Sequence, residues 1–173
     1  MAAIPSPFLP DFASAQKTLA AAPRWSLKAN TDQLYISAPL DIEGVTVEGL
    51  RLGGTAMESR PDEAVTFQLE YLPAKGHGGP FCRIEWRPLS GHSNKGLGPP
   101  EFRFRVQRGS HHHRLDLNWA HSPVGVGRGL VPIAVPIDSD PPDFRGLLEF
   151  VGKEFRIGNI GLVPTPTWKP KLL

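Results

Sequence analysis

Proline and glycine interrupt this chain along its whole length. The 173 residues include 19 prolines and 18 glycines, and these are spread through the sequence rather than clustered. Proline breaks helices and glycine weakens them, so long helices are disfavoured and short strands joined by turns are favoured. We therefore expect a β-rich α+β fold, built mostly from an antiparallel sheet or a sandwich with few helices.

The composition fits one globular domain. Hydrophobic residues make up 40% of the chain and charged residues 21%, which is enough apolar material for a core in a domain of ordinary size. We expect an extended lead over residues 1–10, a single β-rich domain over 11–163 and a tail over 164–173. We find no internal repeat that would argue for a second domain.

Net charge and cysteine content indicate which partners and which cellular compartment to expect. A net charge of +2 gives no general attraction to phosphate backbones or anionic lipid, so we expect no nucleic-acid partner. The one cysteine excludes an internal disulfide and suits a reducing compartment. No apolar run approaches the ~20 residues that cross a bilayer, and the first ten residues do not resemble a signal peptide. We expect a cytoplasmic protein without a membrane partner.

Two helices are expected. Asp11 can cap a helix that runs through the alanine-rich stretch to Ala22, where Pro23 stops it. A late helix is expected near 143–153, opened by the acidic and proline residues at 138–142.

Alternating apolar residues predict several strands. The segments 25–29 and 34–38 are expected to form a hairpin around the turn at 30–32. Val131 to Ile137 contains two prolines, which confine it to a sheet edge. The other expected strands lie at 42–52, 65–71, 81–87, 101–108, 111–119 and 155–163.

Residues with reactive side chains gather between positions 82 and 118. This stretch contains thiol, carboxylate, imidazole and amide groups, from which nucleophilic or metal sites are built. The loop 91–100 within it could serve as a lid or as a plain hairpin connection. The candidate site residues are Cys82, Glu85, His92, His111, His112, His113 and Asn118.

Strand alternation suggests which of these side chains meet. In an expected strand over 111–119, His111 and His113 share a face with apolar residues, which should point toward the core. Cys82 occupies the comparable apolar face of the strand over 81–87. The thiol and the His-x-His pair are therefore expected to meet on the inner side of the sheet. Glu85 falls on the opposite face, so a site that includes it needs a bulge or a strand end.

Two chemistries fit this set. Cys82 could be a nucleophile activated by a histidine, with Glu85 or Asn118 orienting the imidazole. Alternatively, Cys82, His111 and His113 could bind a divalent metal such as zinc, with Glu85 as base toward a bound water. A structural buried cysteine and turn histidines without a chemical role are the remaining interpretation.

The order of Cys82, Glu85, His92 and the run His111–His113 in a β-rich domain resembles the CEHH hydrolases. The resemblance covers residues 82–118. Members of this family accompany bacterial ubiquitin-like conjugation operons and are thought to act as peptidases on the modifier or its conjugates. The resemblance implies that Cys82 is the nucleophile, that Glu85 is an acidic partner and that two histidines come from this set.

The sequence therefore predicts a small thiol-dependent hydrolase or peptidase that acts on a protein modifier or its conjugates. Its catalytic set is Cys82, Glu85, His92, His111, His113 and Asn118, without a cofactor. The alternatives are a zinc-binding β domain that uses Cys82, His111 and His113, and a non-enzymatic module that binds a partner protein.

Overall fold

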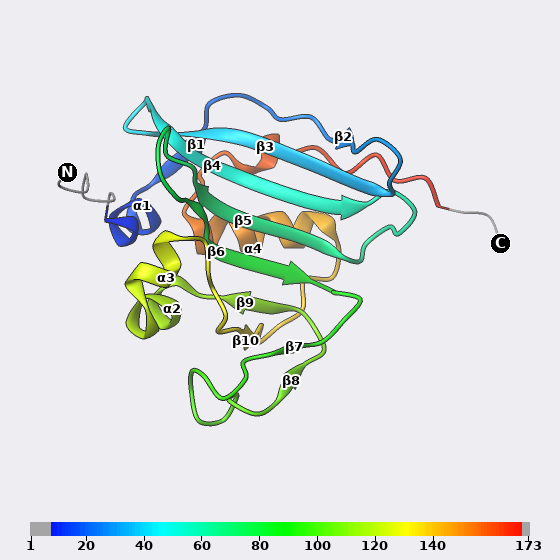
Figure 1. The fold of residues 1–173 in the computed structure, drawn as a ribbon. Helices are drawn as coiled ribbons and strands as arrows, with labels where there is room; N and C mark the ends of the chain where they lie inside the picture. The colour runs from blue at the N-terminus through cyan, green and yellow to red at the C-terminus, as the bar shows by residue number, and fades with distance from the viewer. Residues whose placement is uncertain (1–7, 171–173) are drawn as a thin grey trace.

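The protein is built on one large antiparallel sheet. A computed structural model describes residues 8–170, in which eight strands form this sheet (Figure 1). Its order is β1-β3-β4-β5-β6-β9-β10, and β2 pairs with β3 beside β1. The β-rich α+β fold is thus confirmed. The strands are β1 (Lys17–Leu19), β2 (Ser26–Leu27), β3 (Gln33–Ile42), β4 (Val45–Met57), β5 (Val65–Tyr71), β6 (Gly79–Trp86), β9 (His111–His113) and β10 (Val135–Pro136).

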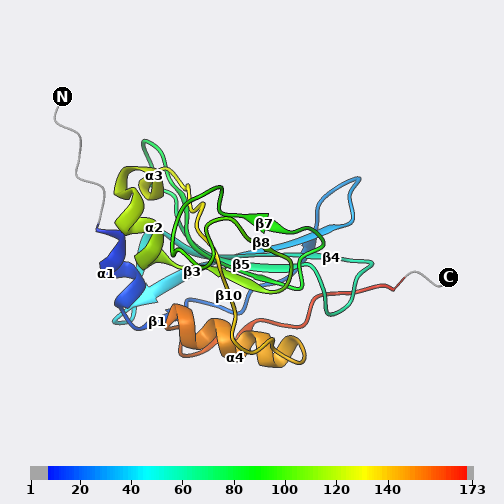
Figure 2. The same cartoon turned by 90° about the horizontal axis from the view of Figure 1, so that it is seen from below.

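Helices and a small ribbon complete the fold. Strands β7 (His92–Ser93) and β8 (Val106–Gln107) pair with each other, outside the large sheet. Helix α4 lies along one face of the sheet, and the three shorter α-helices gather at one end (Figure 2). The helices are α1 (Leu9–Ser14), α2 (Leu115–His121), α3 (Pro123–Gly127), α4 (Phe144–Phe155) and the 3-10 helix η1 (Ile160–Leu162).

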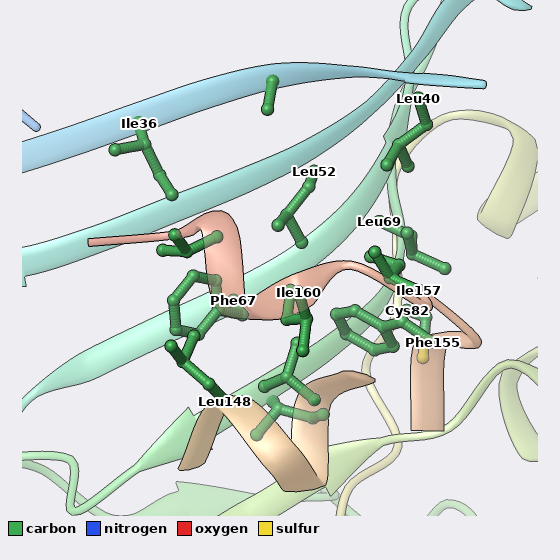
Figure 3. Packing of buried hydrophobic residues seen from close by; sticks show 14 of the residues in the cluster. Ile36, Leu40, Leu52, Phe67, Leu69, Cys82, Leu148, Phe155, Ile157 and Ile160 are labelled. Carbon is green, nitrogen blue, oxygen red and sulfur yellow. The ribbon is translucent and has the colours of Figure 1, made fainter. Parts of the chain in front are cut away.

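The core lies between the sheet and α4. Buried residues alternate with half-buried polar ones along β5, so one face of the strand is apolar. Helix α4 begins after Asp143, whose carboxylate accepts a hydrogen bond from the Gly146 amide, and it turns one apolar stripe toward the sheet. Figure 3 shows Cys82 among the packed side chains of this core. We call the α4 side of the sheet the inner face and the opposite side the outer face.

The N-terminal helix is shorter than its alanine content predicts. Helix α1 ends at Ser14 instead of Ala22, and Lys17 to Leu19 pair as β1 with β3. The buried Lys17 ammonium donates to the carbonyls of Phe12, Ala13 and Ala15, at 2.7, 3.1 and 2.6 Å. Helix propensity is a weak preference that tertiary pairing overrides, and here the lysine also satisfies carbonyls at the helix end.

Several of the expected strands are wrong in extent or type. Of 101–108, only Val106–Gln107 is a strand, and the rest forms turns. The expected strand at 111–119 stops at His113, and helix α2 follows it. Residues 155–163 contain the end of α4 and η1 rather than a strand. In each segment, apolar spacing was compatible with both helix and strand over so few residues.

The other expectations agree more closely with the structure. Strand β5 covers 65–71, β6 ends one residue short of 87, and the hairpin at 30–32 joins β2 to β3. Of the expected strand at 131–137, only Val135–Pro136 is paired, as β10 at the sheet edge. Residues 1–7 of the expected lead lie outside the described residues. In the expected tail, the Lys169 amide donates to the Glu58 carbonyl at 2.8 Å.

Within residues 8–170, no helix has the length and apolar character needed to span a bilayer.

Candidate metal centre on the outer face of the sheet

The pairing of β6 with β9 divides the candidate residues between the two faces. Ile84 is opposite His112, whereas Arg83 is opposite His113 and Glu85 is opposite His111. Directly opposed residues of an antiparallel pair project to the same side. Glu85, His111 and His113 therefore lie together on the outer face, and His112 points to the inner face with the core.

Three imidazoles converge on the outer face. The strand β7 brings His92 over the sheet, so that its ring centroid lies 4.7 Å from that of His113 and 5.5 Å from that of His111. One ring nitrogen from each of the three residues lies within 4.8 Å of the other two. His111 and His113 are fully buried and His92 is half-buried. Three imidazole nitrogens at this spacing are a common set of ligands for a divalent transition metal.

Backbone carbonyls hold the second nitrogen of each ring. His111 Nδ1 lies 2.9 Å from the Gly109 carbonyl oxygen, and His113 Nδ1 lies 2.6 Å from that of Val131. His92 Nε2 lies 2.8 Å from the Pro132 carbonyl oxygen. A carbonyl can only accept, so each of these nitrogens carries the proton.

In the neutral rings, the remaining nitrogens therefore carry lone pairs. These are Nε2 of His111 and His113 and Nδ1 of His92. Donation of the other ring N–H to a carbonyl is the usual second-shell arrangement of metal-binding histidine, since it fixes both tautomer and ring orientation.

Glu85 faces two of the free nitrogens. One carboxylate oxygen lies 3.4 Å from His113 Nε2 and the other lies 3.5 Å from His111 Nε2. When their Nε2 atoms carry protons, these two imidazoles are the main cause that holds the pKa of Glu85 well below its usual range. If the rings are instead neutral, with their protons on Nδ1, a carboxylate at this place faces two lone pairs, which repel it. A divalent cation among the three groups would turn this repulsion into attraction.

Protonation of the rings is the competing explanation, and at His113 burial opposes it. The ring centroids of His111 and His113 are 5.2 Å apart, so two imidazolium charges would be close together. Burial is the largest influence on the pKa of His113 and lowers it. Both Nε2 atoms are buried, and neither has a hydrogen-bond partner in residues 8–170. Unpaired buried nitrogens are costly, which favours a ligand that uses both of them.

Two asparagines fix the segment that supplies two of the carbonyls. Asn118 pairs with both backbone groups of Ile133, accepting from its amide at 2.9 Å and donating to its carbonyl at 2.8 Å. Asn94 holds Ala134 in the same way, at 2.9 Å for both bonds. The preceding two carbonyls, of Val131 and Pro132, are the ones that orient His113 and His92. The asparagines thus act on the histidines through the backbone.

The spacing of the donor nitrogens is somewhat wider than a bound metal requires. Zinc–nitrogen distances are about 2.0–2.1 Å, which places tetrahedral ligands ~3.3 Å apart. The three nitrogens lie within 4.8 Å of one another, so at most about 1.5 Å remains to close. His92 is on a two-residue strand at the half-buried side of the cluster, so it can supply this movement most easily.

The inner face contains a separate arrangement of Cys82, His112 and Glu154. Cys82 Sγ lies 3.1 Å from His112 Nε2, and His112 Nδ1 lies 3.7 Å from a Glu154 carboxylate oxygen. His112 and Glu154 line a cleft of about 600 Å³, but Cys82 does not reach its surface. Burial lowers the pKa of His112 to about 4, so this ring is neutral at pH 7.

Burial also makes the thiol of Cys82 a poor nucleophile. Desolvation raises its pKa to about 12, and only 6% of the residue is exposed. At pH 7.5 we expect iodoacetamide to alkylate Cys82 more than a hundredfold more slowly in the folded chain than in guanidinium chloride, because the thiolate is the reactive form. Mass spectrometry of samples quenched over time would measure both rates. Equal rates would show that the sulfur is open to solvent and ionised.

Several of the predicted site residues contact other groups in the structure than the sequence predicted. Cys82 is on the opposite side of the sheet from His111 and His113, so the predicted zinc site of these three residues is wrong. The predicted facing of His111 and His113 assumes a strand over 111–119. The strand ends at His113, and the apolar residues that follow belong to α2. Asn118 contacts backbone groups rather than an imidazole.

The sequence interpretation did not foresee the pairing of Asn94 with Ala134 or the contact of His112 with Glu154. The partners lie 40 and 42 positions apart, and no local spacing indicates them. No family model, curated protein or solved structure matches the chain.

Proposed function

We propose that this protein is a metal-dependent hydrolase whose divalent metal is bound by His92, His111 and His113. The observation that carries the proposal is the set of three free ring nitrogens, each fixed by a carbonyl on the other side of its ring. Three imidazoles leave a fourth position for water, which is typical of catalytic zinc. Zinc is the metal we expect, because three imidazoles with one open position are a usual ligand set of catalytic zinc.

Glu85 is the proposed base. A bound zinc lowers the pKa of its water toward neutrality and polarises a carbonyl. Glu85 is ionised and half-buried beside the two buried histidines, so it can take a proton from that water and return it to the leaving group. Glu85 and His92 are both partly exposed, so the cluster meets solvent on their side.

The resemblance to the CEHH hydrolases supports a peptide or isopeptide substrate. By that resemblance Glu85 and two of the histidines would correspond to the named acidic and imidazole residues, and Cys82 would be the nucleophile, a role that belongs to the second candidate function below. The substrate is then a ubiquitin-like modifier or one of its conjugates, cleaved in the bacterial cytoplasm. The single cysteine is consistent with that compartment.

Replacement of Glu85 by glutamine tests the role of the base. We expect Glu85→Gln to keep zinc within about tenfold of the wild-type affinity, because the three histidines remain. Hydrolysis of p-nitrophenyl acetate by the zinc-loaded protein should fall by ~100-fold or more, which is the usual contribution of a general base. Zinc affinity would be measured with a competing chromophoric chelator, and hydrolysis by nitrophenolate release.

Glu149→Gln is the matched control, because Glu149 is an exposed residue of α4 far from the outer face. It should leave both quantities unchanged. If Glu85→Gln hydrolyses the ester as fast as the wild type, Glu85 is not the base. If zinc accelerates no hydrolysis in any variant, the proposed activity is wrong.

A second candidate function is the thiol-dependent hydrolysis predicted from the sequence. The contact of Cys82 Sγ with His112 Nε2 favours it, and Glu154 could orient the imidazole. This mechanism requires the thiol to be deprotonated and to become accessible to substrate. Cys82→Ala separates the two candidates, since it would abolish thiol-dependent hydrolysis and leave zinc-dependent hydrolysis intact.

A further inference from the structure

Buried nitrogens without partners concentrate around the histidine cluster. Five buried side-chain nitrogens in residues 8–170 lack a hydrogen-bond partner. Two are the Nε2 atoms of His111 and His113, already assigned to the metal. Two more are Arg83 Nε and Gln107 Nε2, both of which can only donate. These two N–H groups cannot bind a metal, so each of them needs a hydrogen-bond acceptor.

Gln107 lies beside His92. These residues are directly opposed in the β7–β8 pair, so their side chains project from the same side of the ribbon. His92 contacts His111 and His113, so Gln107 lies beside the one member of the cluster that comes from the ribbon, where it also lines a cleft with Gly109 and Ser110. Only 8% of Gln107 is exposed, in a loop where Arg105 and Val106 before it and Arg108 after it are exposed. A glutamine is rarely buried with its amide unused.

Arg83 approaches the cluster from β6. It is directly opposed to His113, and its Nη1 lies 3.5 Å from a Glu85 carboxylate oxygen. Its positive charge also contributes to the lowered pKa of His113. The side chain is about 29% exposed, with its Nε buried. The contact with Glu85 uses one edge of the guanidinium and leaves Nε free to donate.

The charges of the loaded site favour an anion. A divalent metal and Arg83 carry three positive charges, Glu85 carries one negative charge, and the neutral histidines carry none. This leaves two uncompensated positive charges in a largely buried place. An oxygen that binds near the metal and accepts from Arg83 Nε and Gln107 Nε2 would neutralise part of the charge and pair both donors.

We infer that Arg83 and Gln107 anchor a carboxylate of the substrate beside the metal. This inference rests on the proposed metal centre, and it defines the substrate class as acyl compounds with a carboxylate close to the scissile bond. Peptides with a terminal or side-chain carboxylate belong to this class.

The anchor can be tested with cobalt in place of zinc. Cobalt(II) absorbs visible light when bound by histidines, so one titration reports metal loading and a second reports succinate binding to the loaded protein. Succinamide, the neutral analogue, is the comparison ligand. We expect the wild type to bind succinate at least tenfold more tightly than succinamide. We expect Gln107→Glu and Arg83→Met to lower succinate affinity tenfold or more, with cobalt bound at least as tightly as by the wild type.

Two control variants sharpen the test. Arg105→Met removes an exposed charge from the same loop and should leave succinate binding unchanged. Arg83→Lys keeps the charge but not the planar donor set, and it should restore part of the affinity. If cobalt binds but succinate affinity is the same in wild type, Gln107→Glu and Arg83→Met, the anchor is wrong and the metal centre stands. If cobalt does not bind the wild type, both are wrong.

Discussion

His113→Ala is expected to lower the affinity of the protein for zinc by ~100-fold or more. A structural zinc site of four ligands has an apparent binding free energy of about 10–16 kcal/mol, so one ligand contributes roughly 3 kcal/mol. His113 is fully buried, and its Nδ1 bond to Val131 points its free nitrogen at the cluster. Water in the place of the ring cannot reproduce this preorganised donor. Competition with a chromophoric chelator would measure the affinity.

His111→Ala should have a similar effect, because His111 is equally buried and is oriented by the Gly109 carbonyl. The matched control is His77→Ala, which removes an exposed imidazole and should leave zinc affinity unchanged. Circular dichroism would show that each variant is folded. If folded His113→Ala and His111→Ala bound zinc as tightly as the wild type, the cluster would not be the metal site.

The pH dependence of metal binding follows from the same geometry. Zinc binds the neutral rings, so protons compete with it as the pH falls. Burial lowers the pKa of His113, and competition at this ring therefore begins at lower pH than at a free imidazole.

We expect Asn118→Leu to lower the free energy of unfolding by about 3 kcal/mol. The substitution keeps the approximate size of the side chain and leaves the buried amide and carbonyl of Ile133 unpaired. Each unsatisfied buried group costs about 1–3 kcal/mol. For a chain of this length the loss corresponds to a decrease in melting temperature of roughly 9 °C. Thermal unfolding in the presence of a metal chelator would measure it.

Asn118→Leu should also weaken zinc binding about 10-fold, because the segment that supplies the Val131 and Pro132 carbonyls loses one of its two asparagines. Gln33→Ala, at an exposed position of β3, is the control and should change neither property. An Asn118→Leu protein as stable as the wild type would mean that Asn94 alone holds the segment.

The sequence predicted the fold where the pattern was long and regular. Strand β5 alternates over seven residues, and α4 has both a capping aspartate and a long apolar stripe, so each was found near its observed position. Strands β9 and β10 have three and two residues, too few to show a period. Helix α1 ends early because Lys17 and β1 are held by partners distant in the sequence, which alanine propensity does not report.

The residues of the candidate site were named from the sequence, but their arrangement in space was not predicted. Glu85, His92, His111 and His113 were all named as candidates, because their groups are the ones that bind metals or move protons. The face on which Cys82 lies was assigned correctly as apolar, but the histidine that shares it is His112. The distinction depends on the register of β6 with β9, which is set by tertiary pairing rather than by local sequence.

The central claim is that three histidines and their carbonyl partners form a metal centre. The most direct measurement is the metal content of the purified protein after incubation with zinc and dialysis against metal-free buffer, combined with X-ray absorption at the zinc edge. We expect one zinc per chain, with scattering from three imidazole nitrogens and no sulfur. A folded chain that retains no zinc, or zinc bound through a thiolate, would contradict the claim.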